Sequence, residues 1–98
     1  MTFKLQMTSE AKLQLQKIMT DSSKIGLQKQ LKKCLRLLSS NPRHPGLNSH
    51  PLVGSEESTG LKIWTSYVQN KTPSAHRVLW CYSNTKKEII ILQVIPHY

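Results

Sequence analysis

A stripe of apolar residues at helical spacing is the feature that most limits the folds open to this chain. The stripe consists of Leu27, Leu31, Cys34, Leu35 and Leu38. Residues at these separations lie on one side of an α-helix, so the stripe predicts a helix with one apolar face. The Ser-Ser-Asn-Pro run over 39–42 predicts where that helix ends. An apolar helix face has to cover another layer, which the rest of the chain must supply.

The segment before this helix predicts a strand and a first, shorter helix. Apolar and polar residues alternate over 2–7, which is typical of a half-buried strand. Thr8 or Ser9 suits the N-cap of a helix over 9–20, in which apolar residues return at helical spacing. The Asp-Ser-Ser turn over 21–23 is short, so we expect the two helices to form a hairpin.

The second half of the chain predicts β-structure. Residues 41–60 form a long segment punctuated by proline and glycine, with a short strand expected around 50–53. Three longer strands are expected over 61–69, 75–83 and 88–95. The predicted fold class is α+β: an N-terminal strand, a two-helix hairpin and a C-terminal three-stranded antiparallel meander, with the helices packed on an antiparallel sheet. The length suits a single domain spanning 1–98.

The chain carries a large excess of positive charge, most of it in the first half. It has 14 Lys and Arg residues against 5 Asp and Glu, which gives a net charge of +9. Residues 1–50 hold 9 basic and 2 acidic residues (+7), and residues 51–98 hold 5 and 3 (+2). This excess favours an anionic partner such as nucleic acid, an anionic membrane surface or an acidic protein. Basic helix faces also occur simply as solvated surfaces, so charge alone leaves both interpretations open.

Other sequence features exclude several classes of protein. Cys34 and Cys81 lie far apart, so we expect a reducing compartment rather than a disulfide scaffold. The N-terminus has no signal-peptide core, and the longest apolar run, 89–92, is too short to cross a bilayer; we expect a cytoplasmic protein with no membrane partner. The four histidines lack metal-ligand spacing, and no phosphate-binding loop or nucleophile elbow is present. Any catalysis is therefore expected to need no metal and no cofactor.

Strand alternation predicts that an arginine and a histidine could meet on one face of the sheet. Arg77 lies within the strand over 75–83. On the last strand, the odd-numbered residues 89, 91, 93 and 95 would share the face that His97 continues. Arginine neutralises charge that develops on a phosphate, and histidine transfers protons near neutral pH. A mid-strand arginine is also common as a surface ion-pair partner, and a terminal histidine as an ordered or frayed chain end.

Several short segments, taken in order, resemble a known family. They are the Pro-Gly-Leu-x-x-His-x-Leu-x-Gly segment over 45–54, the Ala-His-Arg-Val strand over 75–78 and the closing His-Tyr pair. Together with the basic second helix and the order of predicted elements, they resemble the RelE/ParE superfamily of bacterial toxins over essentially the whole chain. The closing pair and the His-Arg strand are most similar to its YoeB-type ribosome-dependent endoribonucleases.

The resemblance implies an activity, partners and roles for three residues. Such toxins enter the ribosomal A site and cut mRNA by attack of a 2′-hydroxyl on the adjacent phosphate, without metal, and an acidic antitoxin silences them in a hetero-oligomer. Arg77 matches the arginine that stabilises the scissile phosphate. His97 matches the proton donor to the leaving oxygen, and Tyr98 the residue that orients or stacks on the substrate.

The general base is where this chain departs from the YoeB-type pattern. Gly46 stands where that pattern has a glutamate, so His50 is the first substitute and Glu57 the second. His50 could equally be a loop hydrogen-bonding residue, and Glu57 part of a solvated acidic patch. The segment over 55–60 is also longer than the usual connection.

The basic residues expected to contact ribosomal RNA, through its backbone and without sequence readout, are Lys29, Lys32, Lys33, Arg36, Arg43 and Lys62. Two other functions remain open at this point. One is a ParE-like toxin that poisons DNA gyrase without RNA chemistry, and the other is a non-catalytic nucleic-acid-binding protein of the same fold.

Overall fold

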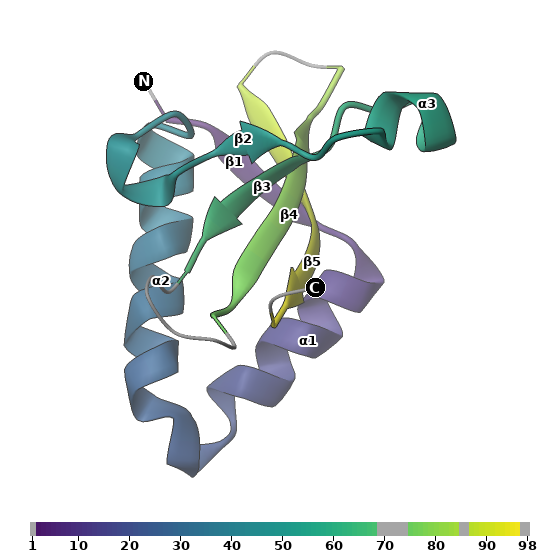
Figure 1. The fold of residues 1–98 in the computed structure, drawn as a ribbon. Helices are drawn as coiled ribbons and strands as arrows, with labels where there is room; N and C mark the ends of the chain where they lie inside the picture. Colours follow the sequence, from purple (N-terminus) through teal and green to yellow (C-terminus); the bar gives the residue numbers. More distant parts are fainter. Residues whose placement is uncertain (1, 69–74, 85–86, 97–98) are drawn as a thin grey trace.

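The structure of the chain, a computed structural model, describes residues 2–68, 75–84 and 87–96 (Figure 1). The first half forms β1 (Lys4–Met7), α1 (Ser9–Met19), the 3₁₀ helix η1 (Ser22–Lys24), α2 (Ile25–Ser40) and the 3₁₀ helix η2 (Pro45–Leu47). The second half forms β2 (His50–Pro51), α3 (Ser55–Thr59), β3 (Trp64–Tyr67), β4 (Arg77–Tyr82) and β5 (Glu88–Ile95). His97 and Tyr98 lie outside the described residues. No helix within the described ranges is long and apolar enough to cross a membrane.

The strands form one mixed five-stranded sheet in the order β1-β5-β4-β3-β2. Strands β3, β4 and β5 are antiparallel neighbours, which confirms the predicted meander, and β2 extends it by an antiparallel pair with β3. β1 runs parallel to β5, with Leu5 opposite Ile89, so the prediction of a fully antiparallel sheet is wrong at this edge. Alternation of apolar residues indicates which side of a strand is buried, but it carries no information on the direction of the neighbouring strand.

The two long helices pack on one face of this sheet and bury the predicted apolar stripe (Figure 1). Leu27, Leu31, Cys34 and Leu38 are buried, and Leu35 packs partly buried against them. Burial raises the pKa of the Cys34 thiol to about 12, so this side chain stays protonated and behaves as a small apolar residue, as the stripe predicts.

Trp80 is the largest fully buried side chain and has no exposed surface. It donates the first of a series of hydrogen bonds that links three segments of the protein. Its indole Nε1 donates to Oγ of Ser66 at 2.7 Å, and the two serine oxygens of Ser66 and Ser49 are 2.6 Å apart. Ser49 Oγ donates to the carbonyl of Pro42 at 2.7 Å. Because the Ser49 proton goes to Pro42, Ser66 must donate to Ser49. This series of hydrogen bonds links Ser49, the residue that precedes β2, to the core of the sheet.

A bulge in β5 interrupts the alternation that the sequence predicts. Leu79 of β4 lies opposite Gln93, but the next residue, Trp80, lies opposite Ile91, which leaves Leu92 as an extra residue. Residues 89 and 91 therefore face the helices, whereas 93 and 95 lie on the other face. The prediction that all four share one face is wrong, because a single inserted residue reverses the side on which every later residue falls.

Side chains of the first helix satisfy the backbone groups around this bulge. Oγ1 of Thr8 accepts a hydrogen bond from Ala11 N as the N-cap of α1, and it donates to the Leu92 carbonyl at 2.9 Å. Gln14 Oε1 accepts a hydrogen bond from the backbone N–H of Val94 at 2.6 Å. A bulge removes backbone groups from strand pairing, and an unpaired buried group is costly, so these contacts stabilise the bulge.

The segment between β2 and β3 contains the short helix α3, which the sequence does not predict. Gly54 and Gly60 precede and follow it with φ values of 82° and 76°, a left-handed conformation that suits glycine. Leu52 N donates to the carbonyl of Ile63 at 2.7 Å, which closes the base of this excursion from the sheet. The strand predicted over 61–69 is therefore shorter in the structure and begins only at Trp64. Figure 1 shows α3 extending from the sheet on the side away from α2.

Candidate functional site

Three side chains from neighbouring strands lie together on the face of the sheet opposite the helices. His50 of β2 is paired with Thr65 of β3, and Tyr67, two residues further along, is paired with Arg77 of β4. Since every second residue of a strand shares a face, His50, Tyr67 and Arg77 share one. Two of these three, His50 and Arg77, are predicted site residues.

Arg77 is held on the ring of Tyr67. Its guanidinium carbon lies 3.6 Å from the ring centroid, a cation–π contact, and the residue is only 9% exposed. The buried nitrogen Nη1 has no hydrogen-bond partner among the described residues, and the same holds for the buried Oγ1 of Thr65. A buried guanidinium nitrogen without a partner is expensive to maintain, and an anion bound against it would satisfy it.

His50 is exposed, and one of its ring nitrogens is fixed by the backbone. Nδ1 lies 2.9 Å from the carbonyl oxygen of Asn48, and because a carbonyl can only accept, Nδ1 carries the proton. In the neutral ring Nε2 then holds a lone pair that is free to accept a proton. The His50 ring meets the Tyr67 ring edge-on at 6.2 Å, so Tyr67 contacts both predicted site residues.

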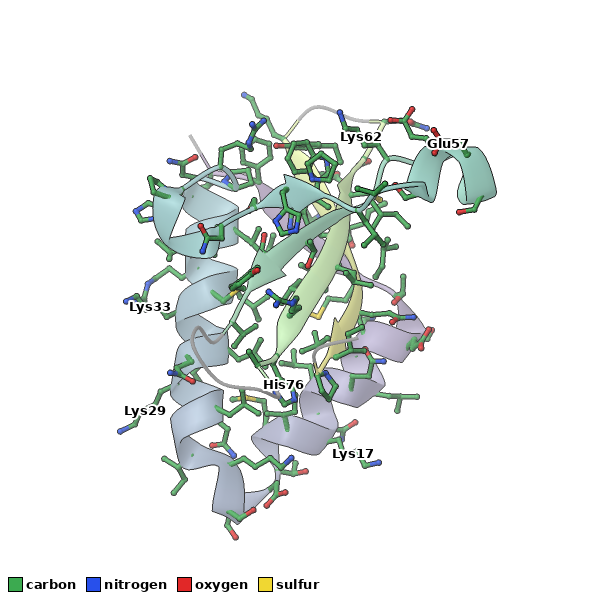
Figure 2. The ribbon with its side chains drawn as sticks, in the orientation of Figure 1. Lys17, Lys29, Lys33, Glu57, Lys62 and His76 are labelled. Carbon is green, nitrogen blue, oxygen red and sulfur yellow. The ribbon has the colours of Figure 1, made fainter. Side chains whose placement is uncertain are left out.

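The basic residues expected to bind RNA fall into two groups. Lys29, Lys32, Lys33 and Arg36 are all exposed on α2. Figure 2 shows Lys29 and Lys33 extending from α2 on the side away from the sheet. The second group has two members.

That second group consists of Arg43 and Lys62, which lie over the Trp64 ring at 4.7 and 5.4 Å from its centroid. Trp64 stacks on buried Trp80, with the ring centroids 5.5 Å apart. Both cations are therefore near the helix-facing side of the sheet, not beside Arg77.

Comparison with known proteins shows the fold. No protein-family model matches the sequence, and no curated protein is significantly similar to it. A YoeB/ParE toxin from Agrobacterium tumefaciens superimposes with a TM-score of 0.73 at 18% identity, over 97% of this chain and 99% of that one. A chain of the archaeal RelE–RelB complex from Pyrococcus horikoshii OT3 gives 0.66 at 18% identity, over 98% and 96%. A metal-bound toxin from Helicobacter pylori gives 0.64 at 12% identity, over 97% and 94%. The chain has the RelE/ParE toxin fold.

Within this RelE/ParE fold, the two candidate bases are placed very differently. His50 lies beside Tyr67, whereas Glu57 lies on α3, is exposed and has no contact with Arg77 among the described residues. Figure 2 shows Glu57 on the projecting helix α3. The part of the chain that the structure describes holds no group of three residues suited to a metal ion.

Tyr67 is the site residue that the sequence analysis did not single out. It lies inside the strand that the sequence predicts over 61–69, and an aromatic residue in such a segment indicates only β-structure. Its importance comes from the register that places it opposite Arg77. The sequence does not determine that register, because the connection over 68–76 is long enough to allow several pairings.

We expect His76, next to Arg77, to make the stability of this RelE/ParE fold depend on pH. Burial first, and the positive charge of Lys24 second, lower the pKa of His76 below its ordinary value of 6.5. As pH falls through about 6.5, the unfolded chain takes up the proton before the folded protein does, so the free energy of unfolding decreases. Urea titrations at pH 7.5 and 5.5 should show a smaller decrease for His76→Gln than for the wild type. An equal decrease in both proteins would contradict this assignment.

Proposed function

We propose that this protein is the toxin of a toxin–antitoxin pair and a ribosome-dependent endoribonuclease that cuts mRNA in the A site and so inhibits translation. The fold it shares with a YoeB/ParE toxin and with the RelE–RelB complex supports the toxin function and a protein antitoxin as partner. The observation that carries the RNA chemistry is the cluster of Arg77, Tyr67 and His50, which sets an anion-binding group beside a proton acceptor.

In the proposed reaction, the 2′-oxygen of one nucleotide attacks the adjacent phosphorus. A bond forms between that oxygen and phosphorus, and the bond from phosphorus to the 5′-oxygen of the next nucleotide breaks. His50 Nε2 takes the proton of the 2′-hydroxyl, and Arg77 binds the phosphate oxygens as their charge increases. His97 returns a proton to the leaving oxygen and Tyr98 orients the substrate, as their match to the YoeB-type pattern implies. The products are a 2′,3′-cyclic phosphate and a 5′-hydroxyl.

The exposed cations of α2 suit the ribosomal partner. Lys29, Lys32, Lys33 and Arg36 can neutralise RNA phosphates without reading sequence, which gives affinity but no specificity. Affinity from such contacts decreases steeply as the salt concentration rises. An acidic antitoxin would be attracted to the same surface by the same charges.

The experiment that tests the proposal is mRNA cleavage on purified ribosomes stalled with an empty A site. Primer extension should show new 5′ ends within the A-site codon, and the upstream fragment should end in a cyclic phosphate. The same mRNA without ribosomes should remain intact. If mRNA stays intact while the protein traps gyrase in DNA cleavage complexes, the ParE-like function is correct instead. If neither occurs, the protein is not catalytic.

We expect His50→Ala to reduce cleavage by about 10²- to 10⁴-fold, the usual contribution of a general base. His44→Asn is the matched control, because the His44 side chain caps η2 by accepting from Gly46 N, and asparagine is a good cap. Cleavage by His50→Ala at the rate of His44→Asn would exclude His50 as the base.

A further inference from the structure

The bulge in β5 decides which face of the sheet the end of that strand presents. Ile95 follows the extra residue Leu92 and is paired with Arg77 of β4, so both lie on the face opposite the helices. His97, which lies outside the described residues, is two positions beyond Ile95. We propose that Gln14 of α1, through its contact with the bulged segment, positions His97 on the face of Arg77. The proposal rests on the proposed function and adds to it a residue that positions the proton donor.

Without the bulge, alternation would turn the end of β5 the other way. Ile89 and Ile91 precede the extra residue and are fully buried in the core beneath the helices. Alternation continued from Ile91 would direct residues 93, 95 and 97 toward the helices as well. The sheet would then separate a donor at position 97 from a phosphate bound at Arg77. The extra residue reverses this assignment, so the bulge is what allows both groups to act on one phosphate.

The bulged segment is held by α1 and its N-cap in the place where a neighbouring strand would otherwise continue. The pairing of β1 with β5 ends opposite Ile91, whose carbonyl also accepts a hydrogen bond from Thr8 N at 3.0 Å. Beyond that point the partners are side chains. Thr8 Oγ1 donates to the Leu92 carbonyl at 2.9 Å. Gln14 Oε1 accepts from the N–H of Val94 at 2.6 Å, which fixes the path of β5 after the bulge.

The Gln14 amide is itself oriented by a second contact. Its Nε2 lies 3.5 Å from Oε1 of Glu10, one turn earlier on α1, and the same oxygen accepts from Nε2 of Gln93 at 3.3 Å. An amide whose oxygen and nitrogen both have partners has one preferred orientation. Val94 is buried, so water is a poor substitute for the Gln14 oxygen. Gln14 is therefore the side chain through which α1 controls the last residues of β5.

A purely structural role is the competing explanation of these contacts. Both explanations expect the loss of the Gln14 oxygen to lower stability, since it leaves a backbone N–H without its partner. Only positioning expects the rate to decrease specifically at the step in which a proton reaches the leaving oxygen. That step can be removed by replacing the scissile 5′-oxygen of the mRNA with sulfur. The phosphorus–sulfur bond then breaks and the sulfur leaves as a thiolate, which needs no proton donor because thiols are much more acidic than alcohols.

The test is single-turnover cleavage of the oxygen and sulfur substrates on ribosomes. Gln14→Ala should cut the natural mRNA about tenfold to 100-fold more slowly, up to the effect of a misplacement of about 1 Å. It should cut the sulfur substrate at nearly the wild-type rate. His97→Ala should show the same pattern, because it lacks the donor itself. His50→Ala and Arg77→Ala should be slow on both substrates, because the base and the phosphate contact are still needed.

Two further variants control for effects on the fold. Gln16→Ala removes the same type of side chain from the same helix, at an exposed position with no side-chain hydrogen bond among the described residues. It should cut both substrates as the wild type does. Gln14→Glu keeps an oxygen that accepts from Val94 N, so it should cut the natural mRNA at close to the wild-type rate. Its charge beside Glu10 should lower stability slightly, which a structural role alone would not separate from the rate.

The outcomes distinguish the inference from the proposed function. Equal slowing of Gln14→Ala on both substrates, or no slowing on the natural mRNA, would overturn the inference and leave the proposed function standing. If sulfur does not restore cleavage by His97→Ala, that residue is not the donor and the inference is wrong. If the wild type cuts neither substrate, the proposed function is wrong and the inference falls with it. If Gln14→Ala does not fold, Gln14→Leu, which keeps the bulk of the side chain without the acceptor, replaces it.

Discussion

Arg77→Ala is expected to reduce cleavage of A-site mRNA by about 10²- to 10³-fold, the usual cost of removing one group that stabilises transition-state charge. Arg77 is almost buried, lies on the Tyr67 ring and has a nitrogen with no partner among the described residues, so an anion is its natural complement. The measurement is single-turnover cleavage on programmed ribosomes. Arg77→Lys should also be strongly impaired, because lysine lacks the planar pair of donors that matches a phosphate.

Arg43→Ala is the matched control for this variant. Arg43 is also an arginine stacked on an aromatic ring, that of Trp64, but it lies on the other side of the sheet. We expect it to change affinity for ribosomes modestly and to leave the rate at saturation unchanged. Arg77→Ala should retain or increase thermal stability, since a site held ready for an anion is commonly destabilising in the free protein. Full cleavage by Arg77→Ala would remove the basis of the proposed mechanism.

Trp80→Ala is expected to lower the free energy of unfolding by about 3–5 kcal/mol, the range for removing a large buried aromatic side chain. A domain of this kind is typically stable by only about 5–15 kcal/mol, so this loss removes a large share of its stability. Trp80 has no exposed surface and stacks on Trp64, so removing its side chain leaves an internal cavity that solvent cannot readily fill. The measurement is urea denaturation followed by circular dichroism.

Tyr82→Ala provides the comparison for Trp80→Ala. Tyr82 is an aromatic residue two positions along the same strand, but it is 42% exposed, so its loss should be clearly smaller. Trp80→Phe keeps most of the packing but removes the donor to Ser66. That hydrogen bond is the first in the series that reaches Ser49, next to His50. This variant should therefore lower the cleavage rate more than its loss of stability explains. Equal losses of stability in Trp80→Ala and Tyr82→Ala would contradict the assignment of the core.

The sequence predicted most of the elements and the buried side of most of them, because those follow from local periodicity. The apolar stripe beginning at Leu27 required a long amphipathic helix, and the structure contains it as α2. The parallel pairing of β1 and the extra residue at Leu92 could not be predicted, since both depend on contacts between distant parts of the chain. Thr8 and Gln14 form hydrogen bonds that stabilise this bulge. From the sequence, Thr8 could be identified only as a candidate N-cap and Gln14 only as a polar residue of a helix.

The candidate site was predictable in part for the same reason. Arg77 matches an arginine of a known family, and His50 is the first substitute for the glutamate that this chain lacks, so both could be named from the sequence. Their proximity depends on the pairing of β2, β3 and β4, which brings each of them against Tyr67. His97 and Tyr98 stay predictions, because they lie outside the described residues.

The excursion that contains α3 offers a place to attach a probe. The chain leaves and re-enters the sheet at one point, where Leu52 bonds to Ile63, and Val53 at its base is 98% exposed. Exposed tips of this kind accept insertions with little effect on the rest of a fold. A fluorophore or an epitope inserted between Glu56 and Glu57 would leave both chain ends unmodified. Such a reporter would make it possible to follow arrival at the ribosome in real time without altering the residues proposed to cut RNA.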